Sequence, residues 1–402
     1  MFLKPPRMSL LNKLQNSLYL LLSLLTLSGC GDLARENQRF GAIIQEVKTR
    51  SAPDPRTSIF GVSFDRTNKG IALSGEVDNA DSKQALIDAL SPFVKKITDN
   101  ITVLPDVRLG GQGWGIVRVS VANMRRDPDE TSELVSQAIM GSLVRVLRQS
   151  GDWYLVQTPD RYLGWMHEDS FVIGTKTNAD AWITAPRVIV LATNGTLREG
   201  PSLRSDAVAD YVAGSLMKNL GSAGPWNKVA LPDGRVGYVA SDAVEDYDLW
   251  KKNTKPTPEG VERTARSLLG IPYLWGGTST KAMDCSGFTK TVYLMNGVQL
   301  NRDANQQAQQ GVEIVPGSKF ENLEKGDLLF FGRKAGNGKP EEVVHVAMYL
   351  KDRMFIHSSG MVKMNSLDPA SPVFDPNKIR SFIYARRVLP AAPTLSEGTS
   401  LR

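Results

Sequence analysis

The chain has 402 residues, of which 41% are hydrophobic and 22% are charged, as in ordinary globular proteins. A chain of this length predicts two to four domains. Its formal net charge is +6, and Lys4, Arg7 and Lys13 supply three of these charges, which leaves +3 for the remainder. So small a charge, without a basic cluster interleaved with aromatic residues, does not indicate a nucleic-acid partner, and we expect none.

Residues 1–29 have the features of an export signal. The three basic residues precede an apolar run from Leu18 to Leu27, which is too short to span a bilayer comfortably. The run ends in Leu27-Ser-Gly-Cys30, which resembles a bacterial lipoprotein processing site. The resemblance implies lipid attachment at Cys30 and a bacterial envelope protein that is anchored to a membrane and faces the periplasm or the exterior. The alternative is an ordinary signal peptide followed by an incidental cysteine.

Residues 30–107 are predicted to form a small α/β domain. Ile71–Val77 is expected to be a strand, Asp81–Val94 an amphipathic helix, and Ile101–Leu104 a returning strand. The segment resembles the small envelope domains called BON domains. A binding role and a simple spacer role are both compatible with this pattern.

An internal repeat follows, with a constant offset of 73 residues. Asn123-Met-Arg125 matches Thr196-Leu-Arg198, and Gly141-Ser-Leu143 matches Gly214-Ser-Leu216. Short β-rich runs separated by turn residues predict one small β-barrel in residues 112–175 and another in residues 185–249. The motifs resemble bacterial SH3 domains, which bind or position more often than they catalyse. We interpret His167, in the first copy, as a surface or packing residue.

A polar linker is predicted from Trp250 to Pro258, followed by a helix over Glu259–Leu269. The last domain is predicted at residues 254–390, with a tail at residues 391–402. Asp284 is a good N-cap residue, so Cys285 should lie in the first turn of a helix. The unpaired backbone N–H groups and the positive dipole end there favour a thiolate. If Cys30 is acylated, Cys285 has no disulfide partner, since the chain has only two cysteines.

The two histidines downstream are predicted to meet on a β-hairpin. Val343–Leu350 alternates as a strand, on which Val343, His345, Ala347 and Tyr349 share one face. A three-residue tip at Lys351–Arg353 would place His357 opposite Ala347 and diagonal to His345, roughly 7–8 Å away between Cα atoms. A cysteine, a histidine that takes its proton and a second group that orients this histidine suit nucleophilic catalysis.

These motifs resemble the NlpC-type cell-wall cysteine peptidases. The matching segments are Tyr273-Leu-Trp-Gly-Gly277, Asp284-Cys-Ser-Gly287, Gly326-Asp-Leu-Leu-Phe-Phe331, His345-Val-Ala-Met-Tyr349 and Ile356-His357. The resemblance implies an α+β multidomain protein, in which a papain-like α+β peptidase domain follows two SH3-like β-barrels and the small N-terminal α/β domain. It also implies that Cys285 is the nucleophile, His345 the base and His357 the orienting residue.

The two-barrel layout is similar to that of γ-D-glutamyl-L-diamino acid endopeptidases. The similarity implies hydrolysis of stem peptides of peptidoglycan that carry a free N-terminal L-alanine, in wall turnover or recycling. It further assigns Tyr273 to the oxyanion site and gives a list of substrate-binding candidates: Trp275, Asp284, Ser286, Arg302, Asp303, and Glu133 and Tyr162 of the first barrel. The alternative for Arg302 and Asp303 is a capped turn.

Two other functions remain open. The chain could be a catalytically silent envelope lipoprotein that binds wall fragments, although a broken triad would then be expected. It could also transfer an acyl group from the thioester to an amine or a lipid. We expect no metal or other cofactor, because two histidines without a nearby carboxylate pair or second thiol make a poor zinc site. The expected partners are muropeptides and a membrane.

Overall fold

The computed structural model of the protein describes residues 33–336 and 338–389, and contacts divide the chain into two compact units at residues 1–104 and 105–402. The export signal, Cys30 and the predicted tail lie outside the described residues. Among the residues described, no helix is long and apolar enough to cross a membrane.

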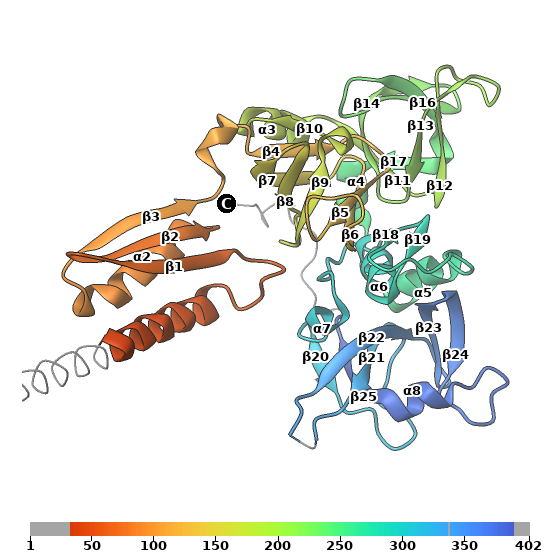
Figure 1. Cartoon of the computed structure of the whole chain (residues 1–402). Coiled ribbons are helices and arrows are strands. Elements are labelled where there is room, and N and C mark those ends of the chain that lie inside the picture. The colour runs from red at the N-terminus through yellow and green to blue at the C-terminus, as the bar shows by residue number, and fades with distance from the viewer. Residues whose placement is uncertain (1–32, 337, 390–402) are drawn as a thin grey trace, which may run out of the picture. The chain divides into compact units, whose positions relative to one another are not determined.

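The first unit is a three-stranded sheet with helices (Figure 1). It contains helical residues 33–51, β1 (Phe60–Thr67), β2 (Gly70–Val77), α2 (Ala80–Leu90), η1 (Ser91–Phe93) and β3 (Ile97–Val103). β2 pairs antiparallel with β1 and parallel with β3, and α2 provides the crossover that a parallel pair requires. Leu73 and Leu86 pack with Phe40 in the core. The predicted strands and helix from residue 71 onward are confirmed, whereas the first helix and β1 were not predicted.

The second unit begins with two β-barrels of identical strand order. The first contains η2 (Val107–Leu109), β4 (Trp114–Val117), β5 (Val121–Arg125), β6 (Leu134–Ile139), β7 (Leu143–Ser150), β8 (Trp153–Gln157), β9 (Leu163–His167), η3 (Glu168–Ser170) and β10 (Phe171–Gly174). The second contains β11 (Arg187–Val190), β12 (Asn194–Arg198), β13 (Ala207–Val212), β14 (Leu216–Ala223), β15 (Trp226–Ala230), β16 (Val236–Ala240), η4 (Ser241–Ala243) and β17 (Val244–Asp246). Strands β4 to β9 recur 73 residues later as β11 to β16, which confirms the repeat.

Each of the two barrels is followed by a short helix. α3 (Lys176–Thr184) follows the first barrel, and its buried Trp182 donates its indole N–H to the carbonyl of Gly141 at 3.0 Å. α4 (Tyr247–Asn253) includes Trp250, which is also buried. The prediction that the linker starts at Trp250 is therefore wrong, because this tryptophan packs as part of a helix. His167 packs edge-on against Trp153 and accepts the N–H of Asp169, as expected of a packing residue.

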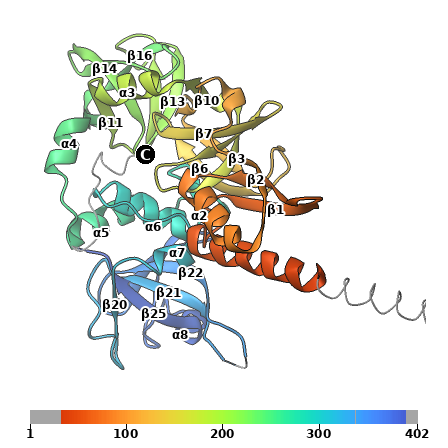
Figure 2. The same cartoon turned by 90° about the vertical axis from the view of Figure 1, so that its left-hand side faces the viewer.

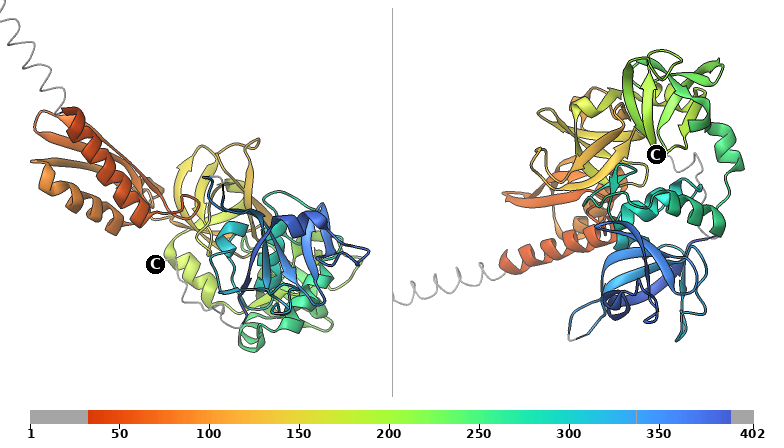
Figure 3. Two further views of the ribbon diagram at one scale, coloured as in Figure 1. Left: turned by 90° about the horizontal axis from the view of Figure 1, so that it is seen from below. Right: turned by 90° about the vertical axis from the view of Figure 1, so that its right-hand side faces the viewer.

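The C-terminal domain of the second unit places helices against a six-stranded sheet (Figure 2). Its elements are α5 (Pro258–Ser267), β18 (Thr278–Ser279), β19 (Ala282–Met283), α6 (Cys285–Leu294), α7 (Ala304–Gln307), β20 (Val312–Ile314), β21 (Leu328–Arg333), β22 (Glu342–Tyr349), β23 (Met354–Ser359), β24 (Met361–Ser366), α8 (Pro376–Ser381) and β25 (Phe382–Arg387). The strand order is β20-β25-β21-β22-β23-β24. Figure 3 shows in its right-hand view that the teal helices lie between the blue sheet and the two barrels.

The core of this domain fixes α6 on the sheet. Phe288 and Val292 of α6 pack in one cluster with Val346 of β22. Ala347, the next residue of β22, belongs to a second cluster, because successive side chains of a strand point to opposite faces. The expected common face fails at Val343, which packs against the first cluster. The reason is a bulge in β22: Phe331 pairs with His345 but Gly332 pairs with Val343, so one residue is skipped.

Candidate active site

The N-terminus of α6 presents Cys285, as the sequence predicts. Asp284 is the N-cap and accepts the backbone N–H of Gly287 at 2.7 Å. A Cβ atom at Gly287 would lie 2.0 Å from the carbonyl oxygen of Gly277, so only glycine permits this close approach of helix and loop. The glycines of the two motifs therefore bring the loop with Tyr273 and Trp275 against the start of the helix.

Cys285 is buried and makes no disulfide among the described residues, with 7% of its surface exposed. Its sulfur accepts a hydrogen bond from the backbone N–H of Val346, the residue after His345. Burial, and then the negative charge of Asp284, raise the pKa of the Cys285 thiol to about 11. The expectation of a thiolate is thus wrong for the unliganded protein, because desolvation outweighs the help of the helix terminus.

The hairpin brings His345 and His357 together as predicted. Met348 pairs with Ile356, and this register, extended by one residue, places His357 opposite Ala347. Met348 and Ile356 are the last paired residues of the ladder between β22 and β23. The imidazole rings stand at 89° with 5.0 Å between centroids, and Nε2 of His345 lies 2.8 Å from Nδ1 of His357.

Asn365 of β24 continues this chain of contacts and fixes the tautomers. Its amide nitrogen donates to the carbonyl of Val373 at 3.1 Å, so its oxygen faces Nε2 of His357 at 3.0 Å. Nε2 of His357 must then carry the proton, and the Nδ1 atom of the neutral ring accepts from Nε2–H of His345. Consequently, Nδ1 of His345 is the nitrogen without a proton and is the one available as a base.

Asn365 was not among the residues predicted from the sequence, although its position carries a signal. β23 and β24 form a second hairpin at Gly360, in which His357 pairs with Lys363. Asn365 is two residues further along and therefore lies diagonal to His357 on the same face. The parity reasoning used for the first hairpin, applied to the second, would have identified Asn365.

Burial keeps both histidines neutral. Desolvation, followed by the charge of Lys378 and by His357, lowers the pKa of His345 well below its usual value. Desolvation likewise lowers the pKa of His357 to about 4, partly opposed by the hydrogen bond with Asn365. The lowered pKa values favour neutral imidazole rings, and the raised pKa of Cys285 favours the thiol.

Tyr273 lies on the loop before α6. Its backbone N–H donates to the carbonyl of Gly360 at 2.9 Å, which ties the loop to the turn after β23. Burial and then the charge of Cys285 raise the pKa of the Tyr273 hydroxyl to about 12, so this group is a hydrogen-bond donor close to the sulfur.

Asp284 and Arg302 form a buried ion pair behind the cysteine. Nη2 of Arg302 lies 2.6 Å from Asp284, and Nη1 donates to the hydroxyl of Ser286 at 3.0 Å. Arg302 is only 1% exposed, so the assignment of Arg302 as a substrate contact is corrected: its guanidinium supports Asp284 and Ser286 from behind. Asp284 also accepts the backbone N–H of Gly276 at 3.0 Å.

The first barrel contacts the loops around this site. The indole N–H of Trp275, a residue that is 63% exposed, donates to Glu133 at 2.7 Å. The hydroxyl of Tyr162 donates to Asp303 at 3.0 Å. Both substrate-binding candidates of the first barrel thus contact candidates of the peptidase domain.

The comparisons with known proteins agree with this geometry. Residues 270–377 match the NlpC/P60 family, and residues 124–171 match the bacterial dipeptidyl-peptidase Sh3 domain. The chain is 30% identical over 273 residues to dipeptidyl-peptidase 6 of Lysinibacillus sphaericus, an alignment that covers 64% of this chain and 93% of that one. The chain belongs to the NlpC/P60 family. It is a cysteine peptidase.

Two further proteins support this assignment. A γ-D-glutamyl-L-lysine dipeptidyl-peptidase of Bacillus cereus is 32% identical over 271 residues, covering 64% of this chain and 76% of that one. The crystal structure of an NlpC/P60 family protein from Bacillus cereus superposes with a TM-score of 0.60 at 27% identity, over 69% of this chain and all of that one. The NlpC/P60 match contains Cys285, His345 and His357, and the Sh3 match contains Glu133 and Tyr162.

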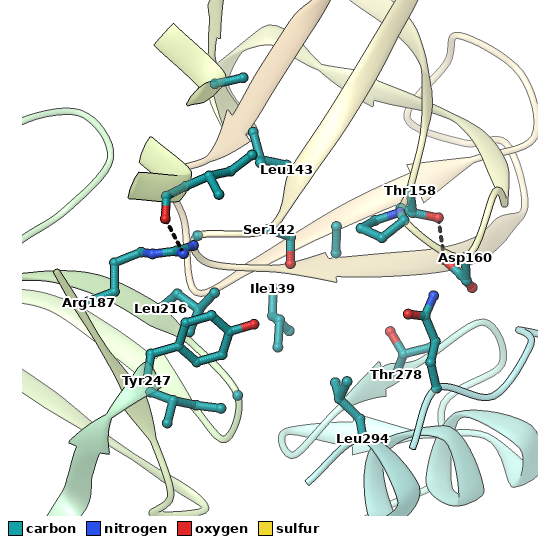
Figure 4. A pocket seen from close by; sticks show the side chains of 18 of the residues that line it. Ile139, Ser142, Leu143, Thr158, Asp160, Arg187, Leu216, Tyr247, Thr278 and Leu294 are labelled. Carbon is teal, nitrogen blue, oxygen red and sulfur yellow. Dashed lines mark hydrogen bonds between the residues drawn. The ribbon is translucent and has the colours of Figure 1, made fainter. Parts of the chain in front are cut away.

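A separate cavity of about 600 Å³ lies away from the NlpC/P60 catalytic candidates (Figure 4). It is bounded by both barrels and by the C-terminal end of α6, and includes Ile139, Arg187, Tyr247 and Leu294. Neither Cys285 nor a histidine lines it. The cavity is therefore separate from the candidate active site around Cys285. Among the described residues, no group of three potential ligands could hold a metal ion.

Proposed function

We propose that this peptidase hydrolyses the bond between γ-D-glutamate and the diamino acid in peptidoglycan stem peptides, with Cys285 as nucleophile, His345 as base and His357 and Asn365 as orienting residues. The observation that supports the proposal most strongly is the line of hydrogen bonds from Asn365 through His357 to His345, which leaves Nδ1 of His345 unprotonated. The substrate class comes from the name of the γ-D-glutamyl-L-lysine dipeptidyl-peptidase of Bacillus cereus.

The proposed reaction starts with proton transfer from Cys285 to Nδ1 of His345. The sulfur attacks the γ-carbonyl carbon of D-glutamate, and the oxyanion accepts hydrogen bonds from the backbone N–H of Cys285 and the hydroxyl of Tyr273. The imidazolium of His345 then protonates the leaving amine of the diamino acid. Water, deprotonated by His345, attacks the thioester and releases the L-Ala-γ-D-Glu product and the free thiol.

We further propose that the substrate carries a free N-terminal L-alanine. Glu133 and Tyr162 of the barrel close the N-terminal side of the site through Trp275 and Asp303. Glu133 and Asp303 place two carboxyl groups at this end, which suits an ammonium group. Ser286 and Asp284 complete this end, with Asp284 acting mainly through the positions of its neighbours because its oxygens already accept several donors.

Cleavage of defined peptides tests both proposals. L-Ala-γ-D-Glu-L-Lys and its diaminopimelate counterpart should yield L-Ala-γ-D-Glu, whereas the same peptides with an acetylated alanine amine should be cleaved at least ~10²-fold less efficiently. Equal cleavage of blocked and free peptides would refute the free-amine preference alone. Binding of these peptides without turnover would support a silent binding protein instead.

We also propose a lipid anchor at Cys30 that holds the enzyme in the cell envelope. The support is the sequence Leu27-Ser-Gly-Cys30, after a basic and an apolar segment. Mass spectrometry of the mature N-terminal peptide should find an acylated cysteine, and a Cys30→Ala protein should leave the membrane fraction. An unmodified Cys30 in the mature protein would contradict the anchor.

A further inference from the structure

Lys378 is a cation without a partner beside the catalytic candidates. It belongs to α8 and is half-buried. Its ammonium makes no hydrogen bond or ion pair with any described residue and lies 5.1 Å from the centroid of the Phe331 ring. Its backbone N–H, in contrast, is held by the N-cap Asp375. The charge of Asp375 also acts on the ammonium, but the two groups form no ion pair, so the N–H donors of Lys378 stay available.

The contacts of Phe331 place Lys378 in the neighbourhood of His345. The Phe331 ring lies 5.9 Å from the ring of His345, so the ammonium and the imidazole pack against the same aromatic side chain. The charge of Lys378 is close enough to act on Cys285, His345 and His357. Lys378 therefore lies in the neighbourhood of the residues proposed to break the bond.

The other cations around the site are either paired with an acid or exposed to solvent. Arg302 is committed to Asp284, as described above. Lys363, on β24, pairs in register with His357 but has an exposed side chain. Removing a cation partly from water costs free energy unless an anion compensates it. Among the described cations near the catalytic candidates, Lys378 is thus the one best suited to bind an anionic group of the substrate.

The proposed substrates supply such a group on each side of the scissile bond. A γ-linked D-glutamate keeps its α-carboxylate, which is four bonds from the scissile carbon, roughly 5 Å at ordinary bond lengths. The diamino acid keeps its own α-carboxylate when it is the last residue of a tripeptide. Both are carboxylates, for which an ammonium donor forms a strong, charge-assisted hydrogen bond.

We propose that Lys378 binds a substrate carboxylate adjacent to the scissile bond. The inference rests on the proposed function and adds a determinant of specificity to it. If Lys378 only packed against Phe331, its loss would have the same effect on charged and uncharged substrates. If Lys378 only stabilised the thiolate of Cys285, its loss would slow the cleavage of every substrate equally.

The test compares three peptides with the wild-type enzyme and three variants. The peptides are L-Ala-γ-D-Glu-L-Lys, its analogue with the glutamate α-carboxylate as an amide, and its analogue with a C-terminal amide. The variants are Lys378→Met, Lys378→Arg and, as the matched control, Lys363→Met. Lys378→Met should lower kcat/KM for the unmodified peptide on the order of 10-fold to 100-fold, mainly through KM, and Lys378→Arg should restore much of it.

The amides identify the carboxylate. One amide analogue lacks the carboxylate that Lys378 binds. On this analogue the wild type and Lys378→Met should have the same kcat/KM, which should equal that of Lys378→Met on the unmodified peptide. Equal losses of Lys378→Met on all three peptides, or a shift in the pH dependence of Cys285 alkylation without a change in KM, would overturn the inference. Failure of the wild type to cleave any of the peptides would instead refute the proposed function itself, and a loss in Lys363→Met as large as in Lys378→Met would refute a specific role of Lys378.

Discussion

Nε2 of His345 lies 2.8 Å from Nδ1 of His357, and this contact decides which nitrogen of His345 can act as a base. Because Asn365 accepts the only proton of the neutral His357 ring, His345 must donate through Nε2. Its Nδ1 atom is then free of a proton. Asn365, on the fifth strand after the helix that carries Cys285, thus sets the protonation pattern of the two histidines.

Substitution of Asn365 should reduce turnover without unfolding the protein. Asn365→Leu removes the acceptor, so we expect kcat to fall on the order of 10-fold, the effect of one lost hydrogen bond. Asn365→Asp keeps the acceptor and adds a negative charge, which should retain most of kcat and move the acid limb of the pH profile upward. Lys363→Met on the same strand is the control. Equal losses in Asn365→Leu and Asn365→Asp would show that the residue only supports the fold.

The pH dependence follows from the shifted pKa values. The lowered pKa of His345 keeps its ring neutral, and thus able to accept a proton, at pH values below its usual range. Activity should therefore persist below about pH 6.5 and be lost as the pH falls through the lowered value. Because burial raises the pKa of Cys285 to about 11, alkylation of the free enzyme by iodoacetamide should accelerate with pH throughout the range from 6 to 10. A plateau of the alkylation rate near neutrality would reveal a resting thiolate and contradict this assignment.

Loss of the buried ion pair should destabilise the protein strongly. Arg302→Met leaves the carboxylate of Asp284 buried without its cation, so the free energy of unfolding should fall by about 3–5 kcal/mol. Urea unfolding measures this change. Arg333→Met removes an exposed arginine that pairs with Glu342 at 2.8 Å, and should cost at most about 1 kcal/mol. Similar costs for the two variants would mean that Arg302 does not support the site from behind.

The contact between the first barrel and the catalytic domain should affect selectivity. Glu133→Gln weakens the acceptor for the indole of Trp275 and removes a negative charge, so the preference for a free alanine amine over an acetylated one should fall by about 10-fold. Glu130→Gln is a matched control, because Glu130 is an exposed residue of the same segment and pairs with Arg125 of the barrel. An unchanged preference in Glu133→Gln would separate the barrel from substrate recognition.

The sequence was sufficient for those parts of the site that depend on local geometry. The N-cap at Asp284 is set within three residues of Cys285, and the meeting of the histidines depends on the length of one tip at residues 351–353. The 73-residue repeat likewise predicted two barrels with the same strand order. Such features can be predicted from neighbouring residues, from the periodicity of helices and strands, and from the number of residues in a hairpin tip.

Features that depend on packing between distant segments were not predicted. The thiol of Cys285 lost its expected low pKa because the surrounding fold buries it, and no local pattern reports that burial. Trp250 was assigned to a linker because polar residues and prolines follow it, yet tertiary contacts bury it in α4. Lys378 carries no motif, and only the fold brings α8 to Phe331. Arg302 was expected in the cleft, but its charge is satisfied behind Asp284.

Release of L-Ala-γ-D-Glu from L-Ala-γ-D-Glu-diamino acid peptides by purified wild-type and Cys285→Ala proteins is the most direct measurement. The side chain of Cys285 is small and nearly buried, so alanine should leave the fold intact, which circular dichroism can verify. We predict that the wild type releases this product and that the folded Cys285→Ala protein shows a rate lower by at least ~10³-fold. Undiminished release by Cys285→Ala would contradict the assignment of Cys285 as the nucleophile and of the surrounding residues as the active site.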